Sequence, residues 1–298
     1  MTTQSVKTAD LTTTYKTVPI DGQDVFYREA GMSDAPVLLL LHGFPTSSNM
    51  FRNLIPKLAP EFHVIAPDYI GYGFSSMPAH ETFSYTFENQ TNFVEELTRE
   101  LHLEKYILYV MDYGAPIGYR LAIRQPERVA GLIVQNGNAY EGGLLKFWDP
   151  IKEYWRDRSA DNEGKVVFLV GLDATKWQYQ NGVRDQSLLD PTAWVLDQFG
   201  LDRPGNGSVQ LDMLYDYRTN LPLYPQFQEF FRKYQPPTLI LWGKNDFIFP
   251  PDGADLYKND LKNLEMHMFD TGHFALETHG DEMAECILKF FALAREKC

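Results

Sequence analysis

Residues 106–115 read Tyr-Ile-Leu-Tyr-Val-Met-Asp-Tyr-Gly-Ala. The apolar run Tyr106–Val110 has the length and composition of a strand buried on both faces. The residues that follow it, Tyr113–Arg124, have the period of a helix. Asp112 stands between the two, with Gly114 directly behind it. A strand that passes straight into a helix is a unit of a parallel sheet, and such sheets carry their working residues at the carboxyl ends of the strands.

The same alternation of strands and helices continues on both sides of this segment. Further strands are predicted at Lys16–Ile20, Asp24–Glu29, Ala35–Leu41, His63–Ala66, Val129–Gln135, Thr238–Trp242 and Glu265–Phe269. Helices are predicted at Met50–Leu58, Phe87–Leu101, Pro251–Asn259 and Asp281–Ala294. The order predicts an α/β protein with a mostly parallel sheet flanked by helices.

The strand rhythm is interrupted in the middle of the chain. Residues 138–235 are rich in Trp, Tyr, Asp and Gly, and four of the five tryptophans lie there. We therefore predict one core domain formed by residues 1–137 and 236–298, with a mostly helical cap at 138–235 inserted into it.

Composition excludes several classes of protein. The chain has 298 residues, of which 44% are hydrophobic and 22% charged, and these are values of a globular protein rather than a disordered or fibrous one. The net charge of −13 argues against nucleic acid and anionic membranes as partners. The N-terminus lacks the features of a signal peptide, and we expect a cytoplasmic protein. The two cysteines, Cys286 and Cys298, form neither a disulfide framework nor a metal site by their spacing.

Other strand ends also carry polar or small residues. His42-Gly43-Phe44-Pro45 follows one strand, Asp246 comes shortly after another, and Asp270-Thr271-Gly272-His273 follows the last. Because parallel strands end at one edge of a sheet, we expect these groups to lie together with Asp112.

This pattern resembles the α/β-hydrolase fold family, and within it the group of epoxide hydrolases and haloalkane dehalogenases that use an aspartate nucleophile. The order Asp112…Asp246…His273 matches the order nucleophile, acid, histidine of that family. The resemblance implies that Asp112 is the nucleophile, that His273 is the base and that Asp246 orients it. It also implies an oxyanion hole formed by the backbone N–H groups of Phe44 and Tyr113.

An aspartate nucleophile restricts the reaction class. A carboxylate that attacks an ester gives an anhydride that reverts, whereas a carboxylate that attacks an sp³ carbon gives a stable alkyl ester. Water activated by His273 would then hydrolyse this ester, while Asp246 holds the imidazole.

Each of these residues also has a structural interpretation. Asp112 could cap the following helix, Asp246 could serve only in a turn, and His273 could be a buried structural histidine. Asp270 is the rival partner for His273. Asn138 occupies a position where some relatives carry the acid, but an amide cannot replace it.

The leaving group is predicted from residues around the nucleophile and in the cap. His42-Gly43-Phe44-Pro45 is similar to the H-G-x-P motif of epoxide hydrolases. Tyr113 stands where both groups commonly have a tryptophan, so the usual halide donor is absent. Tyr217, followed by Arg218, resembles a cap motif of epoxide hydrolases and fluoroacetate dehalogenases. We therefore expect epoxide hydrolysis to a diol, with haloalkane dehalogenation as the alternative.

The cap is expected to bind the substrate. Tyr217 and Tyr154 are predicted to serve the leaving group, and Trp155 and Trp177 to line an apolar pocket for an aromatic small molecule. No cofactor and no metal is expected, and a homodimer is one possible assembly of the chain. Two rivals remain: a ligand-binding protein on a hydrolase scaffold, and hydrolysis of an acyl or carbon–carbon bond without a covalent bond to Asp112.

Overall fold

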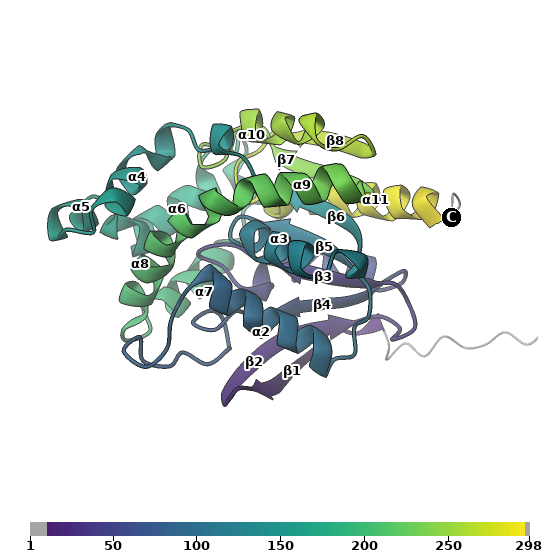
Figure 1. Ribbon diagram of the computed structural model, residues 1–298, viewed down its shortest axis with the longest axis horizontal. Coiled ribbons are helices and arrows are strands. Elements are labelled where there is room, and N and C mark those ends of the chain that lie inside the picture. The colour runs from purple at the N-terminus through teal and green to yellow at the C-terminus, as the bar shows by residue number, and fades with distance from the viewer. Residues whose placement is uncertain (1–10, 296–298) are drawn as a thin grey trace, which may run out of the picture.

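One sheet forms the centre of the molecule (Figure 1). The computed structural model describes residues 11–295. The sheet has eight strands in the order β1-β2-β4-β3-β5-β6-β7-β8. The strands are β1 (Thr14–Ile20), β2 (Gln23–Ala30), β3 (Val37–Leu41), β4 (His63–Pro67), β5 (Tyr106–Met111), β6 (Val129–Gln135), β7 (Thr238–Gly243) and β8 (Leu264–Phe269). β2 is antiparallel to β1 and β4, and all other pairs are parallel, so the predicted mostly parallel sheet is confirmed.

Helices cover both faces of the sheet. One face carries α2 (Phe87–Glu100), α3 (Gly114–Arg124) and α10 (Pro251–Leu256), and the other carries α1 (Ile55–Leu58) and α11 (Ala275–Arg295). The central strands are apolar at every position because alternate side chains enter the two cores. In β3, Leu39 and Leu41 belong to one core, and Leu38 and Leu40 belong to the other. The expected α/β class, with helices flanking the sheet, is confirmed.

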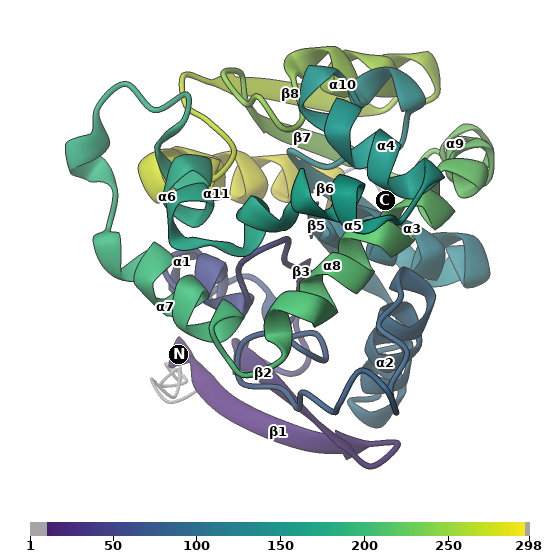
Figure 2. The same ribbon diagram turned by 90° about the vertical axis from the view of Figure 1, so that its left-hand side faces the viewer.

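The segment between β6 and β7 contains helices and short 3₁₀ turns but no strand, and the structure describes all of its residues. The helices are α4 (Asp149–Arg156), α5 (Ala160–Gly164), α6 (Leu172–Gln180), α7 (Pro191–Leu201), α8 (Asn206–Asp216) and α9 (Tyr224–Tyr234). Figure 2 shows α4 to α8 spread across one end of the sheet, while α9 returns along its side next to α3. We refer to residues 138–235 as the cap.

Two predicted helices differ in their bounds. Met50–Leu58 is divided into a 3₁₀ turn at Ser48–Phe51 and the short α1. Pro56 explains the break, because proline has no N–H with which to continue a helix that begins upstream. α11 begins at Ala275, six residues before the predicted start, and passes through a non-helical backbone at His279. The buried side chain of Ala275 holds this first turn against the core.

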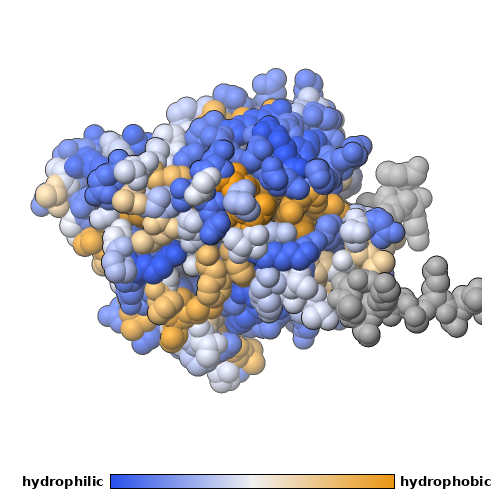
Figure 3. Space-filling view, turned by 90° about the horizontal axis from the view of Figure 1, so that it is seen from below, coloured by the Kyte–Doolittle hydropathy of each residue, from blue (hydrophilic) through white to orange (hydrophobic). Residues whose placement is uncertain are grey.

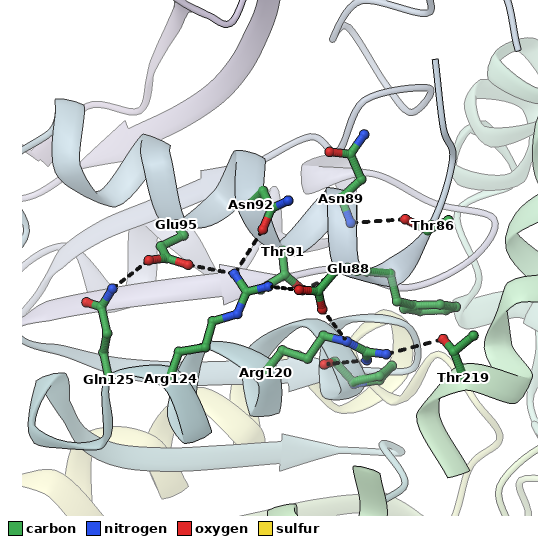
Figure 4. Close-up of polar contacts among 12 residues, drawn as sticks. Thr86, Glu88, Asn89, Thr91, Asn92, Glu95, Arg120, Arg124, Gln125 and Thr219 are labelled. Atoms are coloured by element: carbon green, nitrogen blue, oxygen red, sulfur yellow. Dashed lines mark hydrogen bonds and ion pairs between the residues drawn. The ribbon is translucent and has the colours of Figure 1, made fainter. Parts of the chain in front are cut away.

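An arginine network ties the returning end of the cap to the core (Figure 4). The buried guanidinium of Arg120, on α3, donates to Asn220 Oδ1 at 2.6 Å and to Thr219 Oγ1 at 3.3 Å. It also pairs with Glu88 on α2 at 3.4 Å. The cap is therefore anchored at the helix that begins behind Asp112.

The surface is mixed in character. Figure 3 shows hydrophobic residues in small groups among hydrophilic ones on the face that it displays. No helix among residues 11–295 is long and apolar enough to cross a membrane. Within the same residues, no group of three or more His, Cys, Asp or Glu side chains could hold a metal ion. Cys286 is a partly buried free thiol, and Cys298 lies outside the described residues.

Candidate active site

Asp112 stands on a sharp turn between β5 and α3. Its backbone has a φ of +50°, a left-handed conformation that is strained for a residue with a side chain. The turn is tight because α3 begins almost in contact with the sheet. A Cβ on Gly114 would lie 2.1 Å from the carbonyl oxygen of Leu41, and one on Gly118 would lie 2.5 Å from a methyl of Val110. The small residues behind Asp112 therefore let α3 approach the sheet closely. The sharp turn that results directs the carboxylate of Asp112 outward.

Backbone N–H groups hold the carboxylate of Asp112. The N–H of Phe44 donates to Asp112 Oδ1 at 2.8 Å, and the N–H of Tyr113 also interacts with the carboxylate. Burial raises the pKa of Asp112, and the neighbouring His273 and these two N–H groups oppose the increase. The two predicted donors of the oxyanion hole are thus the two that face this carboxylate.

His273 lies between two carboxylates. Its Nδ1 is 2.7 Å from Asp246 Oδ2, and its Nε2 is 3.8 Å from Asp112 Oδ2. Because a carboxylate only accepts, Nδ1 carries the proton and the neutral ring keeps a lone pair on Nε2. Burial lowers the pKa of His273, but the charges of Asp246 and Asp112 more than compensate, so the pKa lies above its usual value. The structure brings all three residues together.

Asn136 is a site residue that the sequence analysis missed. It follows β6 in a left-handed conformation, with φ of +41°. Its Nδ2 donates to Asp246 Oδ2 at 2.8 Å, and its Oδ1 accepts from the N–H of Gly243 at 3.0 Å. The N–H of Ile248 donates to Asp246 Oδ1 at 2.7 Å. The carboxylate that orients His273 is therefore fixed by donors from two strand ends. The signal in the sequence is its place directly after β6, the same position relative to a strand that marks His42 after β3 and Asp112 after β5.

The rival partners of His273 are occupied elsewhere. Asp270 forms ion pairs with Arg184 at 2.8 Å and Lys244 at 3.4 Å at the surface. Asn138 donates to the carbonyl of Tyr140 and to the hydroxyl of Tyr224. Neither contacts the imidazole in the described structure, which leaves Asp246 as its partner.

His42 supports the loop that carries Phe44. Its ring stacks on Tyr69, with centroids 4.0 Å apart, and its Nε2 accepts from the N–H of Tyr69 at 3.3 Å. Nδ1 lies 2.9 Å from the carbonyl oxygen of Gly43, so the neutral tautomer satisfies both contacts. Burial lowers the pKa of His42 to about 3, and the ring stays neutral. This arrangement is structural.

A cavity lies between Asp112 and the cap, and together with the open space at its mouth it measures about 470 Å³. Its walls are mostly aromatic and aliphatic, with Asp112 and two glutamines as the charged and amide groups. The lining residues are Phe44, Asp112, Tyr113, Phe147, Trp148, Ile151, Leu169, Val170, Gln178, Gln210, Leu211, Leu214 and Ile248. A mostly apolar cavity with few polar groups is the usual form of a small-molecule site.

Tyr217 and Trp155 lie behind the cavity wall rather than on it. The ring of Tyr217 stacks on Trp155 with an interplanar angle of 2° and lies 4.6 Å from the ring of Trp148. Its hydroxyl is 3.4 Å from that of Tyr224. The indole N–H of Trp155 donates to the carbonyl of Leu214 at 2.7 Å. These two residues support the lining side chains.

Trp177 and Tyr154 also stand away from the cavity lining. The ring of Trp177 stacks on Phe147, which does line the cavity, with centroids 5.9 Å apart. Tyr154 directs its hydroxyl to Glu163 Oε2 at 3.2 Å and to the carbonyl of Leu211 at 3.5 Å. Tyr154 and Trp155 are neighbours on α4, so the two side chains leave the helix in different directions. The structure does not bring Tyr154 to the cavity.

An aspartate on such an elbow, beside a His–Asp pair at the carboxyl edge of a mostly parallel sheet, defines a hydrolase of the α/β type. The sequence profile of the alpha/beta hydrolase fold family matches residues 36–280, and the chain belongs to that family. The sequence-based identification is confirmed at this level.

Relatives place the chain in the dehalogenase-like group of the family. It is 46% identical over 276 residues to an uncharacterized hydrolase of Saccharomyces cerevisiae, which covers 91% of this chain and 94% of the relative. It is 35% identical over 272 residues to haloalkane dehalogenase 2 of Mycobacterium bovis, covering 86% and 88% of the two chains. The crystal structure of a haloalkane dehalogenase from Bradyrhizobium elkani has a TM-score of 0.75 at 25% identity, and the match covers 95% of this chain and 100% of that one. The presence of an aspartate at the nucleophile position is consistent with this group.

Proposed function

We propose that this hydrolase cleaves a bond at an sp³ carbon of a small apolar substrate through an ester on Asp112. The observation that carries the proposal is the geometry of the carboxylate: the N–H of Phe44 binds Oδ1, while Oδ2 lies on the side of His273 Nε2. One oxygen is thus held by a fixed donor and the other is available for attack.

In the first step Asp112 Oδ2 attacks the carbon that bears the leaving group. A carbon–oxygen bond forms as the carbon–leaving group bond breaks, and the leaving group departs with the bonding electrons. Oδ1 becomes the carbonyl oxygen of the ester. The attack needs an ionised carboxylate, and the neighbouring His273 and the backbone N–H groups favour that form against the cost of burial.

In the second step His273 takes a proton from water at Nε2, and the resulting hydroxide attacks the carbonyl carbon of the ester. The negative charge develops on Oδ1, where the N–H of Phe44 already points. Asp246 stabilises the imidazolium at 2.7 Å. Collapse of the intermediate releases the alcohol, which takes up the proton, and restores Asp112 with one oxygen from water.

A carbon–halogen bond is our first candidate for the bond that is cleaved. Relatives that bear the name haloalkane dehalogenase support it. So does the position of the cap tyrosines, because an epoxide oxygen needs a phenolic proton donor and Tyr217 and Tyr154 lie off the cavity lining.

Epoxide opening is the second candidate, favoured by one observation. Tyr113 lines the cavity directly beside the nucleophile. Burial raises the pKa of Tyr113 well above its usual value, so its phenol keeps the proton that an opening epoxide would need. Tyr113 is accordingly the residue to test for this reaction.

Trapping of the ester tests the proposal. The variant His273→Gln should complete the first step but not the second, so intact-protein mass spectrometry should detect an adduct. A 1-bromoalkane adds its alkyl group in place of a proton, and styrene oxide adds its whole mass. Peptide mapping should locate the adduct on Asp112, and Asp112→Ala should abolish it. His267→Gln, at an exposed histidine on β8, is the matched control and should accumulate no adduct.

The outcome also separates the two candidates and their rivals. An alkyl adduct supports dehalogenation, and an epoxide adduct that is lost in Tyr113→Phe supports epoxide opening. Turnover that survives Asp112→Ala would overturn the proposal and favour acyl or carbon–carbon hydrolysis without a covalent ester. Ligand that stays unchanged on the unmodified protein would favour a binding function.

A further inference from the structure

Two glutamines of the cap reach the active-site cavity. Gln178 comes from α6 and Gln210 from α8, and their exposed fractions are 3% and 1%. Among residues 11–295, no protein group forms a hydrogen bond with Gln178 Nε2 or with Gln210 Oε1. Buried polar atoms almost always have partners, because an unpaired one costs free energy. Both residues line the active-site cavity, where a bound molecule could supply the missing partners.

The orientation of the Gln210 amide follows from its neighbours. Asn206 Nδ2 donates to the carbonyl of Gly200 at 2.6 Å, so Asn206 Oδ1 faces the other way as an acceptor. Gln210 Nε2 donates to this oxygen at 3.0 Å. A reversed amide would set two oxygens against each other. Gln210 therefore presents an acceptor, its Oε1, without a protein donor.

Apart from Asp112 and the phenol of Tyr113, the remaining walls offer few polar groups to a ligand. The indole N–H of Trp148 already donates to the carbonyl of Ile248 at 2.9 Å. Most other lining residues are aliphatic or aromatic. The glutamines thus form a polar spot in an apolar cavity that also contains Asp112.

The pair distinguishes ligand groups by their chemistry. A carboxylate accepts from Gln178 but has no hydrogen for Gln210 Oε1. An ammonium group donates to Gln210 but cannot accept from Gln178. A hydroxyl group does both, since it carries one hydrogen and two lone pairs. A plain hydrocarbon chain leaves Gln178 Nε2 and Gln210 Oε1 unpaired.

We propose that Gln178 and Gln210 form a subsite for a neutral hydroxyl group, so that the preferred substrates are haloalcohols or hydroxy-epoxides rather than plain haloalkanes or charged acids. This inference rests on the proposed function, since it assigns the substrate class of the same cavity. The hydroxyl accepts from the Gln178 amide and donates to Gln210 Oε1, while the reactive carbon faces Asp112.

The first test compares matched substrates in the His273→Gln background. The rate of adduct formation is measured for ω-bromoalcohols of three to six carbons and for 1-bromoalkanes of equal length. A preference for the alcohol of about tenfold or more is expected at the length that spans the cavity, because a site built for a hydroxyl discriminates against its absence.

Variants then assign the preference to the amides. Gln178→Leu and Gln210→Leu keep the approximate volume and remove the polar group, and each should bring the ratio of the two rates towards one. Gln180→Leu, two residues further on α6 and absent from the cavity lining, is the matched control and should retain the preference. Equal rates at every length in the parent, or a preference that survives both variants, would overturn the inference.

A binding measurement separates this inference from the covalent mechanism. Calorimetric titration of the unmodified protein with 1-pentanol needs no reaction. Weaker binding by about tenfold in the two leucine variants, and not in Gln180→Leu, supports the subsite even if no adduct forms with any substrate. Equal binding in all variants refutes the subsite even if adducts form.

Discussion

Replacement of Asn136 by glycine should show how far the acid residue of the site depends on its neighbour. Glycine tolerates the φ of +41° at this position, so the change removes the side chain without backbone strain. Three bonds disappear: the donation to Asp246 Oδ2, the acceptance from the Gly243 N–H and a long donation to the Gly243 carbonyl at 3.4 Å. The bond to the buried carboxylate and the bond from the buried N–H carry most of the effect, so we expect the free energy of unfolding to fall by about 3–5 kcal/mol.

The effect on His273 is more specific. Asn136 Nδ2 and His273 Nδ1 share the same oxygen, Asp246 Oδ2. Without the amide, this oxygen interacts more strongly with the imidazolium, which raises the pKa of His273 further. If the imidazolium gains roughly 1.4 kcal/mol of interaction with Asp246 Oδ2 when Asn136 is removed, the pKa of His273 rises by about one unit.

The assay is the pH dependence of ester hydrolysis, measured in single turnovers after the ester on Asp112 has formed, with urea denaturation in parallel. The acid limb should move upwards by about one pH unit in Asn136→Gly. Asn138→Ala, in the same loop but bonded to Tyr140 and Tyr224, should leave the limb in place. An unchanged or lowered limb in Asn136→Gly, or an equal shift in both variants, would refute the link between Asn136 and the base.

Three further predictions concern charge and space. The charges of Asp246 and Asp112 hold the pKa of His273 above 6.5, so an NMR titration of the unmodified protein should find the imidazole midpoint above pH 6.5; a midpoint at or below that value contradicts the assignment. Burial raises the pKa of Asp197 to about 7. Between pH 4 and 7 the folded protein therefore holds a proton that the unfolded chain has released. The free energy of unfolding should fall over this range by up to about 4 kcal/mol. Asp197→Asn keeps an acceptor for the Tyr179 hydroxyl, which donates to Asp197 at 2.6 Å. The variant should resist urea better than the parent at pH 8 but not at pH 4.5. A variant that differs from the parent equally at both pH values would contradict the raised pKa of Asp197. Gly43→Ala would set a Cβ 2.3 Å from the Cβ of Asp112, so adduct formation in the trapping variant should slow by about 100-fold, and an unaffected rate would show that the loop moves freely.

The core of the fold could be predicted because its sequence signals are local. The run Val37–Leu41 is apolar at each position, which a strand between two helical layers requires. Asp112, Asp246 and His273 could be grouped from their places after strands, because the topology of a parallel sheet brings its carboxyl ends together. Asn136 follows the same rule, but a second asparagine, Asn138, stands two residues later, and the sequence alone does not show which of the two faces Asp246.

The cap could be predicted only as a helical segment. Its aromatic residues point in several directions from each helix, so the sequence does not show which of them face Asp112. Tyr154 and Trp155 are adjacent, yet one bonds Glu163 and the other stacks on Tyr217. Gln178 and Gln210 carry no motif, and only the packing of α6 and α8 reveals that they line the cavity.

The aromatic wall of the cavity gives the protein an optical reporter of its own. Trp148 lines the cavity, and Trp155 lies behind it with ring centroids 5.8 Å apart. A molecule that enters the cavity contacts the indole of Trp148 and changes the emission of the pair. Stopped-flow fluorescence can therefore follow filling, reaction and emptying without an attached dye. A released bromide is a heavy-atom quencher and would add its own signal. The fluorescence of the side chains that enclose the ester would therefore report the rates at which the ester forms and is hydrolysed.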